Sequence, residues 1–206
     1  ARRAPRGLGA ADIDPARVHY VGLSLGGIVG VAQAKYASAI RTATVAAPGG
    51  VLSRIANDSA TFGPIYRAAL AGRLINNSFT WNKFWAELQT IGDSGDPINH
   101  ICECANFKPM HLIKVIGDTV IPNNSTDRLI TAGGLKKVSA LGPTAVGPGD
   151  GAYVAFTQGS HGSLFDPTAS LAATTEMQRQ SVLFATSAVQ PGGPFVVITD
   201  PTVIQP

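Results

Sequence analysis

The stretch that decides the fold is Val18-His-Tyr-Val-Gly-Leu-Ser-Leu-Gly-Gly-Ile-Val-Gly30. It is a short apolar run, a Gly-x-Ser-x-Gly pentapeptide and a second apolar run rich in small residues. This pattern predicts a buried strand over residues 18–23 that turns sharply into a helix over residues 26–37. Ser24 stands at the tip of the predicted turn, so the sequence indicates a strained connection with one serine exposed on it.

The residues around Ser24 suit chemistry at its hydroxyl group. Gly22 and Gly26 are expected to remove side chains that would collide with the strand and the helix. The backbone N–H of Leu25 is then expected to point toward the atom that the hydroxyl would attack, as an oxyanion donor. A second interpretation stays open, in which the stretch is a glycine-rich turn and Ser24 only caps the helix.

Composition limits the classes of protein that fit this sequence. The 206 residues are enough for one domain with a hydrophobic core; 45% are hydrophobic and 14% are charged. The net charge is only +3 and no basic stripe with interleaved aromatic residues occurs, which argues against nucleic-acid binding. No apolar run is long enough to predict a membrane span.

The order of the predicted elements indicates an α/β protein. A strand over residues 40–47 follows the first helix, and strand, helix and strand across this length form a βαβ unit with two parallel strands. Residues 51–107 lose the strand pattern and indicate a helical insertion, or cap. Strand character returns at residues 111–116 and 153–157.

This reading divides the chain into three parts. We expect an α/β core from residues 1–50 and 108–190, a helical cap from residues 51–107, and a C-terminal extension from residues 191–206. Within them, residues 135–151 are expected to be loop, a helix is expected from Asp166 to Ser187, and an extra edge strand is expected at residues 195–199. Residues 1–12 are expected to be a polar surface segment, without an initiator Met or a signal peptide.

Three loops that follow predicted strands carry the candidate catalytic residues Ser24, Asp118 and His161. Loops after the carboxyl ends of parallel strands gather at one edge of the sheet, so these side chains can converge. A serine hydroxyl is a weak nucleophile at neutral pH. It needs a base to take its proton and a carboxylate to orient that base.

Other carboxylates compete with Asp118 for the role of the orienting acid. Asp127 falls inside a predicted helix, while Asp96 and Asp166 precede prolines and are expected to cap helices. The remaining competitors are Asp93 and Asp150.

Other histidines compete with His161, and one of them lies near two cysteines. His19 and His111 lie at or near strand starts, the wrong edge of the sheet, and His100 lies in the insertion. Only His100 and Cys104 share a helical face, and a structural zinc site usually needs four ligands, so core packing is expected there. We therefore expect no metal, no cofactor and no bond between Cys102 and Cys104.

The sequence resembles the C-terminal part of an α/β-hydrolase, and within that fold it is similar to bacterial extracellular lipases. The resemblance covers about residues 12–188 and is carried by the 18–30 stretch, Gly117-Asp-Thr-Val-Ile-Pro-Asn123 and Gly159-Ser-His-Gly-Ser163. It implies an α/β-hydrolase-type, mostly parallel sheet flanked by helices. It also implies hydrolysis of carboxylic esters, such as acylglycerols, through an acyl-serine, and it alone suggests secretion.

The chain departs from the family ahead of the serine. Such hydrolases carry several strands before the nucleophile, and a loop after one of them supplies the second oxyanion donor. Fewer than two dozen residues precede Ser24 here. We therefore expect that the N-terminal strands are lacking, and that a partner is the missing N-terminal portion of the same enzyme as a second fragment. Transient contact with a lipid interface is a further expectation.

The function predicted from sequence is that of a serine hydrolase, a lipase or carboxylesterase. An acyltransferase with the same triad is an alternative that nothing in the sequence separates from it. A non-catalytic binding module on the same scaffold is a second alternative. It is less favoured because all three candidate catalytic residues are present.

Overall fold

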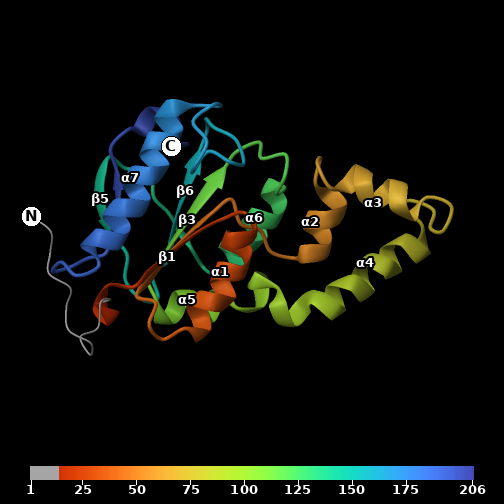
Figure 1. Cartoon of the computed structure of the whole chain (residues 1–206), viewed down its shortest axis with the longest axis horizontal. Helices are drawn as coiled ribbons and strands as arrows, with labels where there is room; N and C mark the ends of the chain where they lie inside the picture. Colours follow the sequence, from red (N-terminus) through yellow and green to blue (C-terminus); the bar gives the residue numbers. More distant parts are fainter. Residues whose placement is uncertain (1–13) are drawn as a thin grey trace, which may run out of the picture.

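The central sheet is parallel throughout. In the computed structural model, which describes residues 14–206, its strands lie in the order β1-β2-β3-β6-β4, and every neighbouring pair is parallel (Figure 1). The strands span His19–Leu23 (β1), Thr42–Ala46 (β2), Met110–Val115 (β3), Lys136–Lys137 (β4) and Ala152–Phe156 (β6). The prediction of a mostly parallel α/β sheet is confirmed.

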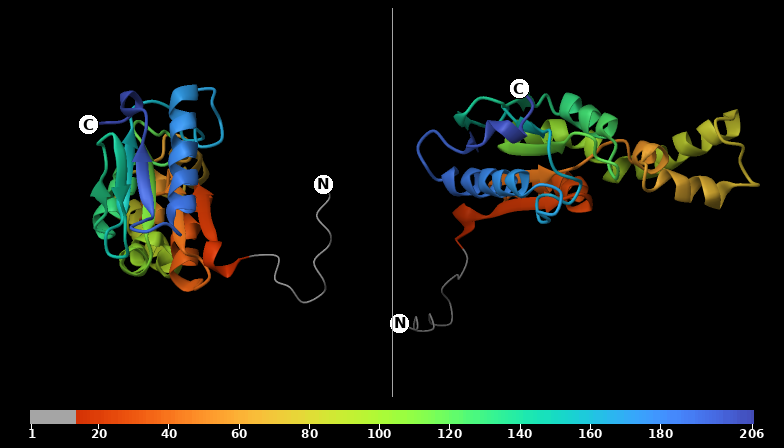
Figure 2. Two further views of the ribbon diagram at one scale, coloured as in Figure 1. Left: turned by 90° about the vertical axis from the view of Figure 1, so that its left-hand side faces the viewer. Right: turned by 90° about the horizontal axis from the view of Figure 1, so that it is seen from above.

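Helices cover both faces of this sheet (Figure 2). Packed on one face are α1 (Leu25–Tyr36), α5 (Ile101–Phe107) and α6 (Asn123–Ala132). The other face carries α7 (Leu171–Ser187) and a small antiparallel sheet of β5 (Gly142–Ala145) and β7 (Phe195–Ile198). Short 3-10 helices complete the described chain: η1 (Pro15–Arg17), η2 (Asp93–Gly95), η3 (Pro97–Asn99) and η4 (Pro201–Val203).

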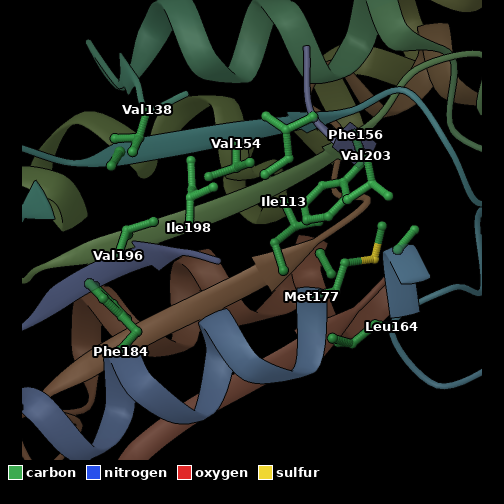
Figure 3. Packing of buried hydrophobic residues seen from close by; sticks show 14 of the residues in the cluster. Ile113, Val138, Val154, Phe156, Leu164, Met177, Phe184, Val196, Ile198 and Val203 are labelled. Carbon is green, nitrogen blue, oxygen red and sulfur yellow. The ribbon is translucent and has the colours of Figure 1, made fainter. Parts of the chain in front are cut away.

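Two hydrophobic clusters hold the layers together. Figure 3 shows the first, where Met177 and Phe184 of α7 face Ile113 of β3 and Ile198 of β7. The second lies across the sheet and joins α1, α5 and α6 to residues such as Leu112, which is fully buried. A parallel sheet buried on both faces needs apolar side chains in both directions, which is why β2 and β3 have no polar-out alternation.

A helical arm, residues 52–92, lies between β2 and β3 in the sequence and extends away from the sheet (Figures 1 and 2). It consists of α2 (Leu52–Asp58), α3 (Gly63–Leu70) and α4 (Phe79–Gly92). Asp96 fastens its base, because its buried carboxylate accepts hydrogen bonds from the backbone N–H groups of Val51 and Leu52 at 3.1 and 2.7 Å. None of the described helices is both long and apolar enough to cross a bilayer.

The structure corrects two boundaries expected from sequence. Residues 135–151 are not all loop, because they hold β4 and β5, which the Gly/Pro content concealed. The helix expected from Asp166 begins only at Leu171, where the Ser170 hydroxyl accepts the N–H of Ala173 at 3.2 Å. The extra strand expected at residues 195–199 is present as β7, and it pairs with β5 in the small antiparallel sheet. The prediction for residues 1–12 lies outside the described residues.

Candidate active site

The loops that carry the three candidate catalytic residues lie at one edge of the sheet. Ser24 directly follows β1, Asp118 follows β3, and His161 follows β6. The register aligns these strand ends, with Leu23 paired to Ala46, Ala46 to Ile113, and Val115 to Phe156. The carboxyl edge of the sheet therefore gathers all three loops, as the sequence order of strands and loops predicts.

Asp118 and His161 are in direct contact. Nδ1 of His161 lies 2.7 Å from Oδ2 of Asp118, and the side chains are 17% and 2% exposed, respectively. The other oxygen of Asp118 accepts the backbone N–H groups of Val120 and Ile121 at 2.8 and 3.0 Å. Because a carboxylate can only accept, Nδ1 of His161 donates this hydrogen bond, and Nε2 is the ring nitrogen left to act as a base.

The loop that holds Asp118 is braced by Asn123. The Asn123 amide oxygen accepts the N–H of Gly117 at 2.8 Å, and its NH₂ group donates to the Val115 carbonyl at 2.7 Å. Gly117 has a φ of +78°, a conformation that a residue with a Cβ rarely adopts. Asn123 thus closes the turn over which the chain leaves β3 and presents Asp118.

Ser163 braces the loop that holds His161. Its buried hydroxyl accepts the N–H of Ser160 at 2.7 Å, and its own N–H donates to the Ser160 carbonyl at 3.0 Å. Gly159 has a φ of +105°, and a Cβ there would lie 2.9 Å from the Ser163 hydroxyl oxygen. The sequence analysis quoted Asn123 and Ser163 within motifs without assigning them a role, since neither hydrogen bond is visible in a linear pattern.

Ser24 occupies a strained turn. Its φ of 56° and ψ of −119° lie in a region that L residues rarely adopt, and its backbone bonds Ala46 O and Ile28 N, both at 2.9 Å. Its side chain makes no capping hydrogen bond to α1, although it stands at the N-cap position. This disfavours the interpretation of Ser24 as a simple helix cap.

The glycines of the turn do not all act as expected. A Cβ at Gly22 would lie 2.5 Å from the Gly26 carbonyl oxygen, so that position needs glycine. A Cβ at Gly26 would meet nothing closer than 3.9 Å, so the expectation that Gly26 relieves a collision is wrong. Gly30 fills that role, because a Cβ there would lie 2.2 Å from Cε1 of Tyr20.

The oxyanion donor expected from sequence is the N–H of Leu25, the first residue of α1. The first N–H groups of a helix have no partner within the helix and carry its positive dipole end, which suits them to a negative oxygen. No hydrogen bond joins the Ser24 hydroxyl to His161 within residues 14–206. Catalytic hydrogen bonds are often long in the absence of substrate.

The competing carboxylates lie elsewhere and have other partners. Asp96 fastens the base of the arm and caps η3, as its position before Pro97 predicts. Asp127 and Asp150 form surface ion pairs with Lys114 and Lys136. The last two, Asp93 and Asp166, bond Gln89 and the backbone of Thr168, respectively.

The competing histidines also lie away from the carboxyl edge. His19 begins β1 and bonds the Thr42 hydroxyl at 2.8 Å. His111 is fully buried beneath α7, and His100 bonds the Ser94 carbonyl at 2.9 Å. Within residues 14–206, no cluster of three metal-ligating side chains occurs, and Cys102 and Cys104 are both free thiols.

An apolar pocket of about 460 Å³ opens beside β1 and α7. Its lining includes Val21, Leu164, Phe165 and Val182. Leu164 and Phe165 belong to the segment that follows His161, but none of the three candidate catalytic residues lines the pocket.

Comparisons with known proteins agree on the architecture. No protein-family model and no curated protein matches the sequence. Among solved structures, puromycin hydrolase aligns over 91% of this chain and 24% of its own, with a TM-score of 0.59 and 18% identity. A Mycobacterium tuberculosis puromycin-hydrolyzing peptidase aligns over 87% of this chain and 22% of its own, with a TM-score of 0.55 and 22% identity.

A third solved structure is an esterase. Acetyl xylan esterase 1 from a Thermoanaerobacterium species aligns over 83% of this chain and 48% of its own, with a TM-score of 0.51 and 15% identity. The chain therefore spans less than half the length of each of these structures. They are a puromycin hydrolase, a peptidase and an esterase, and none is named as a lipase, so they support the fold but not the narrower resemblance.

Structural similarity at identities of 22% or less speaks for the architecture alone, and that architecture is a parallel sheet with helices on both faces. The chain has the α/β-hydrolase fold.

Proposed function

We propose that this chain carries the nucleophile, the base and the orienting acid of a serine hydrolase that cleaves carboxylic esters. The observation that carries the proposal is the hydrogen bond between Asp118 and His161. Ser24 lies at the same edge of the sheet, in a strained turn, and its hydroxyl makes no capping hydrogen bond to α1. A histidine oriented by a buried carboxylate, together with a serine hydroxyl at the same edge of the sheet, is the set of groups that activates a hydroxyl at neutral pH.

In the proposed reaction, Oγ of Ser24 attacks the carbonyl carbon of the ester and gives its proton to Nε2 of His161. Asp118 keeps the ring in the tautomer that can accept this proton and stabilises the imidazolium that forms. The N–H of Leu25 stabilises the negative oxygen of the tetrahedral intermediate. His161 then protonates the leaving alcohol, and water, activated by the same ring, hydrolyses the acyl-serine.

The substrate class is the finer part of the proposal. Amide and ester hydrolysis share the acyl-serine step, and the solved structures with this fold include both peptidases and an esterase. Lipid-like esters are favoured by the helical arm, whose exposed side chains include Ile75, Phe79 and Ile91, each about four-fifths exposed at 79%, 81% and 78%. The connection between α2 and α3 contacts the loop that holds Asp118, because the N–H of Thr61 donates to the Thr119 carbonyl at 3.2 Å.

One further donor is needed, because a tetrahedral oxyanion is best stabilised by two N–H groups. We propose that a portion of the same enzyme outside these residues supplies it, packed near the open edge of β1.

Covalent labelling tests the proposed nucleophile directly. A fluorophosphonate probe is expected to label the 206-residue chain at Ser24, and the label is expected to be lost in Ser24→Ala and strongly reduced in His161→Ala. Labelling that persists at another residue in Ser24→Ala would redirect the assignment. A folded chain that never reacts, even with the remaining portion of the enzyme present, would contradict it.

The substrate class is tested with a series of p-nitrophenyl esters from acetate to palmitate, run beside an aminoacyl p-nitroanilide. Lipid-like substrates predict rates that rise with acyl chain length. A sharp preference for acetate would leave an esterase without the lipid preference, and faster cleavage of the anilide would make the enzyme a peptidase.

A further inference from the structure

The N-terminus of helix α1 lacks the side-chain hydrogen bond that an N-cap residue usually provides. A serine at the N-cap position usually accepts an N–H from the first turn, and this bond stabilises the helix end. Ser24 has a positive φ and makes no such bond, so its hydroxyl is left free at the site. The first turn of α1, which includes Leu25, must therefore be held in another way.

Tyr20, on strand β1, contacts the first turn of α1. Its hydroxyl donates to the carbonyl oxygen of Gly26 at 2.7 Å. Within residues 14–206, no other side chain makes a hydrogen bond to the first turn of α1. Tyr20 lies on β1, four residues before Ser24, so the bond ties the strand to the helix across the turn.

The glycines around the turn form a slot for the Tyr20 ring. A Cβ at Gly22 would lie 2.7 Å from Cε1 of Tyr20, and a Cβ at Gly30 would lie 2.2 Å from the same atom. Real Cβ atoms do not approach this closely, so the ring can lie against the helix backbone only because both positions lack side chains. Gly26 and Gly30 are four residues apart in α1 and so share the face of the helix that lies toward Tyr20.

We propose that Tyr20 is a positioning residue for the nucleophile, acting through the first turn of α1. This inference rests on the proposed function. The Tyr20 hydroxyl holds the Gly26 carbonyl, and thereby the backbone of Ser24 and the N–H of Leu25, in the geometry that the reaction needs. Because it donates to a carbonyl oxygen and not to an N–H group, it holds the first turn while the first N–H groups of the helix and the Ser24 hydroxyl stay available for the reaction.

Tyr20→Phe tests this assignment, because it removes the hydroxyl and keeps the ring in its slot. We expect the second-order rate of fluorophosphonate labelling to fall about five- to tenfold, the factor that corresponds to one lost hydrogen bond. The pH dependence of labelling is expected to keep its midpoint, since the contact between His161 and Asp118 is untouched. Tyr36→Phe is the matched control, because Tyr36 ends the same helix and is 69% exposed.

A second measurement does not depend on reactivity. Hydrogen exchange of the Ile28–Gly30 amides, which bond the first-turn carbonyls, is expected to quicken by a similar factor in Tyr20→Phe and to stay unchanged in Tyr36→Phe. Wild-type protein that fails to label, even with the remaining portion of the enzyme present, would contradict the proposed function, while hydrogen exchange would still test the bond between Tyr20 and Gly26. Unchanged labelling together with unchanged exchange would overturn the positioning role. A lowered Tm with unchanged labelling would make Tyr20 merely structural.

Discussion

Oδ2 of Asp118 accepts a hydrogen bond from Nδ1 of His161 at 2.7 Å, across 43 residues of sequence. The two residues follow adjacent strands, β3 and β6, whose register brings Val115 beside Phe156. The bond decides which ring nitrogen carries the proton and so which one faces the site as a base.

Asp118→Asn is expected to keep the fold and to reduce the rate of ester hydrolysis or labelling by about 10³- to 10⁴-fold. An amide in place of the carboxylate favours the wrong tautomer of His161 and no longer stabilises the imidazolium. Rates of labelling at Ser24 measure the effect. The matched control is Asp127→Asn, since Asp127 pairs with Lys114 on the surface, and a rate within about twofold of wild type is expected there. Equal losses in both variants would contradict the role of Asp118.

His111 is expected to make the fold sensitive to acid. Burial lowers the pKa of His111 to about 3, with the nearby Gln180 side chain opposing part of this shift. The folded state therefore keeps this ring neutral, while the unfolded chain takes up a proton below a pKa of about 6.5. The unfolded state binds more protons between these values, so stability is present above this range and is lost as pH falls through it.

The expected contribution is a loss of about 2 kcal/mol between pH 7 and pH 5. Urea unfolding at several pH values measures it. His111→Leu places an apolar side chain of similar size against Phe184 and is expected to remove this part of the pH dependence. If wild type and variant lose stability in parallel on acidification, His111 is not the group responsible.

Gly30 and Gly26 are expected to respond oppositely to replacement by alanine. Gly30→Ala drives a Cβ into the Tyr20 ring and is expected to cost about 1–3 kcal/mol of stability. Gly26→Ala meets no atom closer than 3.9 Å and is expected to stabilise the helix by about 0.5–1 kcal/mol. Chemical denaturation of the two variants checks both signs. A neutral Gly30→Ala would mean that the ring has room to move.

The edge strand β1 is expected to promote self-association of the isolated chain. Within residues 14–206 it pairs only with β2, through backbone bonds that involve Val18 and Ser24. The alternation of a parallel ladder then leaves the N–H and C=O groups of His19, Val21 and Leu23 facing outward.

Val21→Lys is therefore expected to reduce association severalfold, because Val21 is 44% exposed and a lysine on an edge strand opposes pairing. Light scattering over a range of protein concentrations measures this. The control Ile75→Lys makes a similar change on the helical arm, away from any strand edge. Equal effects of both variants would assign the association to apolar exposure in general.

Much of the architecture could be predicted because it is encoded locally. The 18–30 stretch predicts strand, turn and helix through apolar runs and glycines that neighbouring residues reveal. The observed β1 and α1 begin and end within one residue of that prediction. Asp96 directly before Pro97 likewise predicts an N-cap, and Asp96 caps η3 in the structure. Failures occurred where local patterns are weak, as in the two-residue strand β4, which exists only because β6 lies beside it.

What the sequence by itself determined is the order of strands and helices and the presence of a serine, an acid and a histidine in the loops after the strands. Those features follow from side-chain periodicity and from residues close together in the chain. Only the tertiary structure decided that Asp118 meets His161, that Asn123 and Ser163 brace their loops, and that Tyr20 fills a slot between Gly22 and Gly30. Such contacts depend on strand register and packing distances, which are set by the whole fold and leave no local pattern in the chain.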